Sequence, residues 1–322
     1  MSSEADARKS IAHKSFNSLF DLIQKNNLSI ITSITLITGN LDIYAMILIG
    51  DWLKNNTTLT SLTLIKNQIK GASPLAEALM VNTSLTTLDL SENKIGNRSA
   101  NAFFTMLQTN NTIRSLHFGY NNISDTGIVS LENNTSLTTL NLRFNKISNA
   151  GMISLVESIK LNRGLRILDL SYNIIGDSGD AFKTFFEYNS TLLELDIGST
   201  NITQGVFDAF IDILKMPSCA LKKFTIMSGD LSFSVSYSSF NNDVYFNYDK
   251  LIDAIKNNTT LQEFWFNMFG VDRYLGWTYS QTINEVLERN KLIEKIYPLI
   301  CCSQRRGMFL PDEIWTKVSK LH

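Results

Sequence analysis

Two stretches of the sequence carry the same pattern: LTTLDLSENKIG spans residues 85–96, and LTTLNLRFNKIS spans residues 137–148. Both have leucine at the first, fourth and sixth places, asparagine at the ninth and isoleucine at the eleventh. They differ at the seventh and eighth places, where Ser91 and Glu92 in the first stretch become Arg143 and Phe144 in the second. A pattern that recurs along a chain predicts a repeat architecture, and the places that vary within it are candidates for function.

This frame of apolar residues, with asparagine at the ninth place, occurs in five successive units, numbered here one to five. The units begin at Leu59, Leu85, Ile113, Leu137 and Leu165. Degenerate frames, with another residue at the ninth place, begin at Ile31, Leu192, Leu221, Leu261 and Ile293. Successive starts lie 24 to 32 residues apart, except for one gap of 40 residues after Leu221. This gap indicates an insertion.

Each unit combines the periods of a strand and a helix. Leu140 and Leu142 flank one polar residue, which is the period of a strand with one buried face. The segments between frames carry apolar residues at helical spacing, such as Ala100, Phe103 and Leu107. One unit alone cannot bury its apolar face, so we expect neighbouring units to stack around a continuous core.

The frame resembles the leucine-rich repeat, whose L-x-x-L-x-L-x-x-N/C-x-L phrase matches the five central units at nearly every letter. The resemblance covers residues 31–303, and units of about 28 residues with a full helix are most similar to the ribonuclease-inhibitor type. The resemblance implies an α/β solenoid of horseshoe shape, with an inner parallel β-sheet and outer helices.

The ends of the array and its insertion are predicted to differ from the repeat. Residues 1–30 are expected to form an N-terminal capping helix, because apolar residues between Ile11 and Ile23 follow helical spacing. Residues 304–322 are expected to form a C-terminal capping helix. The insertion over residues 231–248 alternates apolar and polar residues on both sides of a turn, which predicts a β-hairpin.

Two asparagines recur in the central units. The ninth-place asparagines are expected to bond the backbone of their own and adjacent units as a structural ladder. They are Asn67, Asn93, Asn121, Asn145 and Asn173. The other asparagine, such as Asn82 or Asn134, lies three residues before each frame and is expected to close a helix in a left-handed backbone conformation. The Asn-X-Ser/Thr motifs that result are interpreted as turns of the repeat.

The third, fifth, seventh and eighth places are expected to face the concave surface. At the seventh and eighth places, the frame makes no demand on the type of residue. Tyr120, Phe144 and Tyr172 occupy the eighth place of units three to five, so strands about 5 Å apart predict a row of aromatic rings. Such a row beside Arg143 and Asp169 is typical of interfaces. The alternative interpretation is that each ring covers its own turn.

We expect a protein partner of unknown identity to bind this surface. The partner-binding candidates are His117, Tyr120, Asn141, Arg143, Phe144, Asp169, Tyr172, Asp196 and Trp265.

Composition argues against several other classes of protein. The 29 Lys and Arg residues against 30 Asp and Glu residues give no overall basic field for nucleic acid. The longest apolar run is too short to span a bilayer, and the first residues lack the pattern of a secretory signal. We therefore expect a monomeric, cytoplasmic protein without membrane insertion.

Signatures of catalysis are scarce in the sequence. The three histidines lie far apart, and the three cysteines have no metal-binding spacing. We expect no enzymatic activity, catalytic residue, metal or cofactor. The alternative is a cytosolic scaffold or enzyme regulator whose chemistry is confined to the insertion or to the C-terminal tail.

We expect a translocated bacterial effector that acts in a host cell, with a cytosolic scaffold as the alternative. An array rich in Asn, Ile and Lys with no further domain is similar to leucine-rich-repeat effectors that intracellular bacteria deliver into host cells by a non-classical route. It is equally compatible with a cytosolic scaffold of the organism itself.

Overall fold

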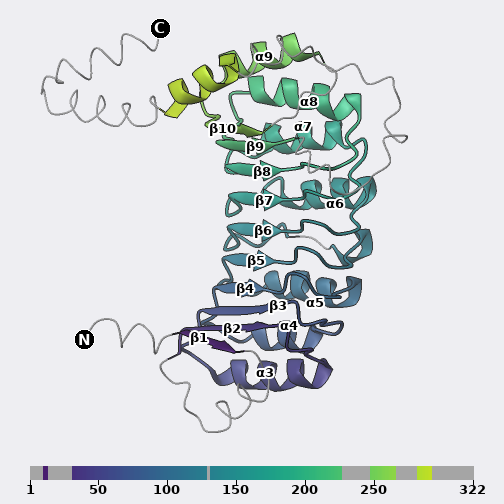
Figure 1. Cartoon of the computed structure of the whole chain (residues 1–322), viewed down its shortest axis with the longest axis vertical. Coiled ribbons are helices and arrows are strands. Elements are labelled where there is room, and N and C mark those ends of the chain that lie inside the picture. Colours follow the sequence, from purple (N-terminus) through teal and green to yellow (C-terminus); the bar gives the residue numbers. More distant parts are fainter. Residues whose placement is uncertain (1–9, 14–30, 129–130, 227–246, 266–280, 292–322) are drawn as a thin grey trace, which may run out of the picture.

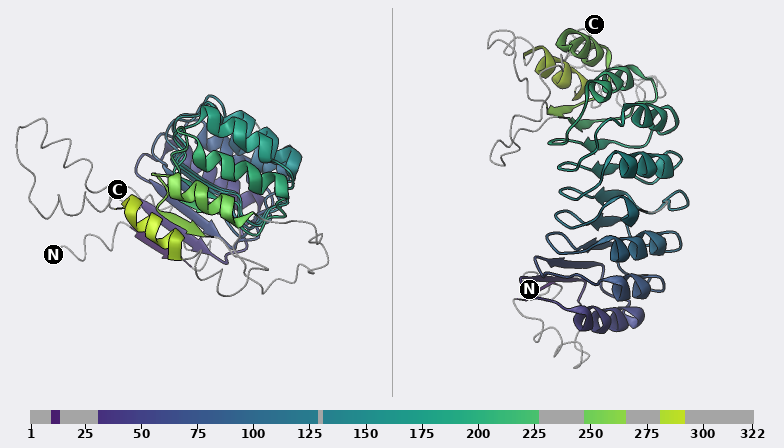
Figure 2. Two further views of the ribbon diagram at one scale, coloured as in Figure 1. Left: turned by 90° about the horizontal axis from the view of Figure 1, so that it is seen from above. Right: turned by 90° about the vertical axis from the view of Figure 1, so that its right-hand side faces the viewer.

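The computed structural model describes residues 10–13, 31–128, 131–226, 247–265 and 281–291 of the 322-residue chain. Short strands and outer segments alternate along the chain, and the units stack along one axis (Figure 1). The strands line one side of the stack and the helices line the other (Figure 2). The predicted α/β repeat solenoid is confirmed.

The strands form one ten-stranded sheet in which every neighbouring pair is parallel and the spatial order follows the chain. They are β1 (Ser10–His13), β2 (Ser33–Ile37), β3 (Ser61–Ile65), β4 (Thr87–Asp89), β5 (Ser115–His117), β6 (Thr139–Asn141), β7 (Ile167–Asp169), β8 (Glu194–Asp196), β9 (Lys223–Thr225) and β10 (Glu263–Trp265). From β4 to β8 the central leucine of each strand is buried, and the residues on either side of it are half-exposed. One face of the sheet therefore remains open to solvent.

The outer segments pack their apolar faces on the other side of the sheet. They are α3 (Ile43–Asn55), α4 (Ser73–Leu79), α5 (Asn97–Leu107), the 3₁₀-helix η1 (Asp125–Gly127), α6 (Asn149–Ile159), α7 (Gly179–Tyr188), α8 (Gln204–Lys215) and α9 (Tyr248–Asn257). A further helix covers residues 281–291, coloured yellow in Figure 1. Ala100, Phe103 and Leu107 of α5 are all fully buried, as their spacing predicts.

Unit three has a 3₁₀-helix where its neighbours have α-helices. Its frame starts only 24 residues before the next frame, the shortest spacing in the array, so less chain is available for a full helix. Phe118 stands at the sixth place, where the other four central units have leucine. Its ring meets Phe103 edge to face with centroids 5.2 Å apart, so a larger side chain fills the core where the outer segment is shorter.

The N-terminal prediction of a capping helix is wrong for Ser10–His13, which form strand β1. Ser10 pairs with Ser33 and His13 with Leu36, so β1 extends the sheet beyond the first frame. Without this pairing, β2 would present a row of unpaired N–H and C=O groups at the edge of the sheet. The remaining residues of 1–30 lie outside the described residues.

The predicted hairpin and C-terminal cap lie largely outside the described residues. The structure describes only the last two residues of the 231–248 insertion. Tyr248 is the first residue of α9 rather than part of a strand, because the Asn247 side chain accepts a hydrogen bond from Lys250 N–H and caps this helix. The cap predicted over 304–322 is not among the described residues.

Candidate functional site

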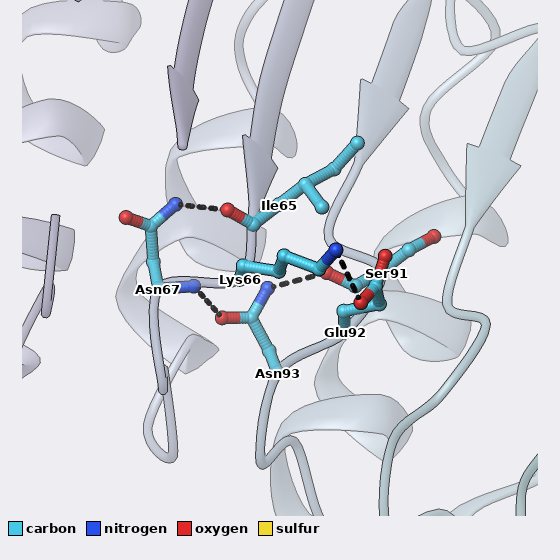
Figure 3. Close-up of polar contacts among 6 residues, drawn as sticks. All are labelled: Ile65, Lys66, Asn67, Ser91, Glu92 and Asn93. Carbon is cyan, nitrogen blue, oxygen red and sulfur yellow. Dashed lines mark hydrogen bonds and ion pairs between the residues drawn. The ribbon is translucent and has the colours of Figure 1, made fainter. Parts of the chain in front are cut away.

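The ninth-place asparagines join the bends of successive units (Figure 3). Asn93 Oδ1 accepts a hydrogen bond from Asn67 N–H at 2.9 Å, and its Nδ2 donates to the carbonyls of Leu64 at 2.8 Å and Ser91 at 3.0 Å. All five ninth-place asparagines are buried, and each donates to a carbonyl of the preceding unit and to carbonyls of its own. These side chains are engaged in the scaffold.

The second set of asparagines has a different role from the predicted one. Where they cap helices, at Asn56, Asn189 and Asn258, their φ angles are −83°, −111° and −81°, so the backbone is extended rather than left-handed. Asn82 Oδ1 accepts from Ser84 and Leu85 N–H, while Nδ2 donates to the carbonyl of Leu53 in the preceding unit. Asparagine is therefore favoured here because one side chain both closes a turn and links two units.

The fifth-place residues are the last residues of strands β4 to β8, and four of their side chains close the turn that follows. Oδ1 of Asp89, Asn141, Asp169 and Asp196 accepts a hydrogen bond from the backbone N–H two residues later, at 2.8 to 3.0 Å. Three of these residues are partner-binding candidates, and their structural role was missed in the sequence analysis. The recurrence of Asp or Asn at the fifth place was the available signal, since both residues close such turns.

The backbone at the eighth place is left-handed, so the expectation that the frame makes no demand there is wrong. The φ angle is 60° at Lys66, 56° at Glu92, 55° at Tyr120, 52° at Phe144 and 57° at Tyr172. The N–H of each of these residues donates to the seventh-place carbonyl of the next unit, which fixes the bend. A left-handed conformation costs a residue other than glycine about 1 kcal/mol or more.

Tyr120, Phe144 and Tyr172 form the predicted row of rings, called here the aromatic row. The Tyr120 and Phe144 rings are stacked, with centroids 4.6 Å apart and planes at 14°, and Phe144 and Tyr172 lie 5.7 Å apart at 35°. Tyr120 is 41% exposed and Phe144 is 37% exposed. The three residues follow strands β5, β6 and β7, so the aromatic row lies along the C-terminal ends of these strands.

The same place carries a different interaction in the two preceding units. Lys66 Nζ lies 3.1 Å from a carboxylate oxygen of Glu92, and Figure 3 shows this ion pair beside the asparagine ladder. Long polar side chains thus occupy the left-handed position in units one and two. The scaffold accordingly does not require an aromatic ring there.

Arg143 is the cation next to the aromatic row. Its guanidinium carbon lies 4.3 Å from the Tyr172 ring centroid, Nη1 donates to Ser171 Oγ at 3.0 Å, and Nε donates to Tyr120 Oη at 3.5 Å. Burial favours a lower pKa for Arg143, but the hydrogen bond to the Tyr120 hydroxyl and electrostatic attraction, chiefly from Tyr120 and Asp169, outweigh it and raise the pKa. The guanidinium is therefore held in place as a charged donor.

The remaining candidates line up across the open face of the sheet. His117 pairs in register with Asn141, Asn141 with Asp169, and Asp169 with Asp196. Asn141 Nδ2 donates to Asp169 Oδ2 at 3.3 Å, and His117 Nε2 lies 2.7 Å from a serine hydroxyl of its own strand. Eight of the nine candidates therefore lie on neighbouring strands and bends.

Trp265, the ninth candidate, lies apart from the others. It is the last residue of β10, and its register partner Thr225 in β9 separates it from Asp196 in β8. The structure describes its strand but not its side chain.

Burial raises the pKa of Asp196 to about 6, and repulsion from Asp169 adds to the increase, while the Gly198 N–H, Arg143 and Lys223 oppose it. A folded-state pKa above the unfolded value means that the folded protein binds more protons between about pH 4 and pH 6. The free energy of unfolding attributable to this group therefore falls as pH rises through that window. Above about pH 6 the carboxylate is ionised in both the folded and the unfolded state, and the decrease in the free energy of unfolding reaches its full size.

Asp196→Asn is therefore expected to stabilise the protein at pH 7.5, by about 1–2 kcal/mol after discounting for solvent screening, and to have little effect at pH 4. Asparagine keeps the turn, because Asn141 makes the same hydrogen bond in unit four. Urea unfolding at both pH values measures the effect. Asp89→Asn, at the same turn in unit two, is the matched control, and an equal gain in both variants would contradict the assignment.

Two further properties concern the described residues only. They contain no group of three or more His, Cys, Asp or Glu side chains placed to hold a metal ion. No helix among them has the length and apolarity needed to cross a membrane.

Stacked units of one short strand, an asparagine-linked bend and an outer helical segment define a solenoid repeat protein. Residues 81–104, 109–131, 133–156 and 161–179 match the family model of the leucine rich repeat. These four segments of the chain are therefore similar to leucine-rich repeats, and proteins that contain such repeats generally bind other proteins.

Similarity to solved structures is limited to the fold. An internalin from Listeria monocytogenes is 17% identical, with 77% of this chain and 71% of that chain covered and a TM-score of 0.44. The C-terminal domain of tropomodulin from Caenorhabditis elegans is 15% identical, with 63% and 98% covered and a TM-score of 0.38. The leucine-rich repeat domain of APL1B is 18% identical, with 63% and 56% covered and a TM-score of 0.39. No curated protein gives a significant sequence match.

Proposed function

We propose that this protein is a non-enzymatic binding module that holds a protein partner against the aromatic row and the adjoining open face of the sheet. The observation that supports the proposal best is the aromatic row itself. Three successive units place an aromatic side chain in a left-handed backbone conformation, with Tyr120 and Phe144 exposed and Tyr172 half-buried. Bulky residues are uncommon in that conformation, and clusters of such residues are found at functional sites.

The packing of the bend alone does not explain why the eighth place is aromatic in units three to five. Units one and two place Lys66 and Glu92 in the same conformation, so polar residues satisfy the bend equally well. Exposed apolar side chains that adjoin one another favour association, whereas isolated ones are ordinary. Tyrosine and arginine are also the residue types that most often dominate binding energy at protein interfaces.

Charged side chains beside the aromatic row favour a partner that presents both apolar and charged groups. Arg143 offers donors toward a carboxylate, and Asp169 and Asp196 offer acceptors on the open face of the sheet. A partner that inserts an apolar side chain against the rings and presents a carboxylate to Arg143 would complement this surface. His117 and Asn141 extend the same face toward unit two.

The test is a variant in which Tyr120, Phe144 and Tyr172 are all replaced by asparagine, which tolerates the left-handed backbone better than alanine. Partners captured from cell extract by the wild-type protein are identified by mass spectrometry, and their affinity for the variant is then measured with purified components. We expect binding at least tenfold weaker, because the ring contacts are lost, with a melting temperature close to that of the wild type.

The matched control is Lys66→Asn with Glu92→Asn, which changes the same place in units one and two. It removes an exposed ion pair of small energetic value and is expected to leave binding unchanged. Undiminished binding by the aromatic variant, or equal loss in the control, would refute the proposed surface.

We further propose that the protein is of the ribonuclease-inhibitor type and acts as a bacterial effector delivered into a host cell. The outer α-helices of 10 to 13 residues in most units support the first point. The second is supported by the Asn-, Ile- and Lys-rich array. Transfer of a tagged copy into infected cells tests delivery. Failure to transfer while known substrates move would favour a scaffold within the organism itself, without affecting the proposed binding surface.

A further inference from the structure

The second place of each frame lies just before the strand, at the opposite end of the strands from the aromatic row. In units one, two and four this place holds Thr60, Thr86 and Thr138. Each threonine hydroxyl donates to the second-place carbonyl of the preceding frame, at 2.9 to 3.0 Å. Units three and five depart from this pattern and have Arg114 and Arg166 instead.

Backbone carbonyls hold these arginines and Arg163 in place. Arg114 Nη1 donates to the carbonyl of Ser136 at 3.0 Å, Arg166 Nη1 to that of Thr191 at 3.2 Å, and Arg163 Nη1 to that of Tyr188 at 2.6 Å. Each arginine thus uses Nη1 to reach the following unit. In the described part of the chain, Nε and Nη2 of all three arginines make no hydrogen bond. Each guanidinium group therefore keeps N–H donors that can bind a ligand.

Arg114, Arg163 and Arg166 are among the residues that line one open hollow of about 420 Å³. Thr138 lies between the two second-place arginines in the sheet order, and its short side chain leaves room there; Gly164 and Asn111 also contribute to the lining. None of the lining residues is acidic, and no carboxylate within the described residues forms an ion pair with these arginines. This is a local concentration of positive charge on a chain of net charge −1.

We infer that this arginine hollow binds phosphate groups. The planar fork of arginine donates two parallel hydrogen bonds to phosphate oxygens, and partial immobilisation of the forks lowers the entropy lost on binding. The lining contains no aromatic ring on which a nucleobase could stack. The ligand is therefore recognised by its phosphate groups, which are carried either by a small free polyphosphate or by a phosphorylated protein segment.

The position of the hollow separates this inference from the proposed partner surface. Arg114 and Arg166 precede β5 and β7, whereas Tyr120 and Tyr172 follow the same strands. Changes in the hollow are therefore expected to leave the aromatic row intact. Each site can be lost without loss of the other.

The experiment measures binding of pyrophosphate and of a phosphoserine peptide to the full chain by isothermal titration calorimetry. The variant Arg114→Thr with Arg166→Thr restores the residue that units one, two and four use at this place, so we expect it to fold. It should weaken binding of the phosphate ligands at least tenfold. The exposed Arg163→Gln change gives an independent measurement without altering the frame, and a loss of at least threefold is expected.

Controls separate the phosphate site from general charge effects. Lys94→Gln with Arg98→Gln removes the same number of positive charges, two, at residues that do not line the hollow. This control variant should leave binding of the phosphate ligands unchanged. Tighter binding of the phosphoserine peptide than of pyrophosphate would support a protein ligand, and the reverse order a free polyphosphate. Absence of binding, equal binding of the unphosphorylated peptide, or equal loss in the charge control would overturn the inference.

Discussion

Replacing Asn145 by alanine is expected to lower the free energy of unfolding by about 4 kcal/mol. The Asn145 side chain is 8% exposed, and its Oδ1 accepts a hydrogen bond from Ile123 N–H at 3.0 Å. Its Nδ2 donates to the carbonyls of Phe118 at 2.9 Å and Leu142 at 3.0 Å. Alanine would leave the buried Ile123 N–H without its partner, which costs about 1–3 kcal/mol. It would also remove one of two hydrogen bonds to each carbonyl, at about 1 kcal/mol per bond, because Phe118 and Leu142 still accept from Asn121 and Asn173.

Urea unfolding monitored by circular dichroism measures this loss. Asn145→Thr is the matched control, because Thr200 occupies the ninth place in the unit that begins at Leu192. The Thr200 hydroxyl donates to the carbonyl of Ile197 at 2.7 Å, so threonine restores one of the lost bonds and should be intermediate in stability. A loss below about 1 kcal/mol for the alanine variant would show that the ladder contributes little.

The repeat could be predicted from the sequence because the same physical demand recurs in every unit. Leu140 and Leu142 must enter the core and Asn145 must close the bend, so the spacing of these residues is kept while other places vary. The strand at Ser10–His13 could not be predicted in this way. Its pairing partner is the edge of the sheet at β2, which becomes apparent only when the units are stacked.

The candidate site was predicted in part for the same reason. Equal spacing of Tyr120, Phe144 and Tyr172 was enough to predict adjacent rings, because parallel strands in register place equal positions side by side. The left-handed backbone beneath the rings carries no such signal. Glycine and asparagine usually mark that conformation, and neither residue stands at the eighth place of these units.

Units three and five depart from the repeat at both ends of their strands, and unit four departs at the end that carries the aromatic ring. The aromatic row follows β5, β6 and β7, and the second-place arginines precede β5 and β7. Units one and two instead carry the Lys66–Glu92 ion pair at one end and Thr60 and Thr86 at the other. Because one scaffold tolerates both arrangements, stability alone does not account for the rings and the arginines in the central units.

Gly164→Ala is expected to lower the free energy of unfolding by about 3 kcal/mol. A Cβ at residue 164 would clash with the Thr135 carbonyl oxygen and lie 3.0 Å from that of Leu137. Both obstacles are backbone atoms of unit four and its preceding turn, so no side-chain rotation can relieve the clash. Serine or threonine occupies the equivalent place in other units, as at Ser84 and Thr191, which indicates that the approach is closer at Gly164.

Gly96→Ala is the matched control for this loss. A Cβ at Gly96 would have no atom within 4 Å, and its φ of −104° suits any residue. We expect a change within about 0.5 kcal/mol for this variant, measured by the same urea unfolding. Equal effects of the two substitutions would mean that close contact between units does not determine the cost at Gly164. A large loss confined to Gly164→Ala would instead show that this close approach constrains how unit five stacks on unit four.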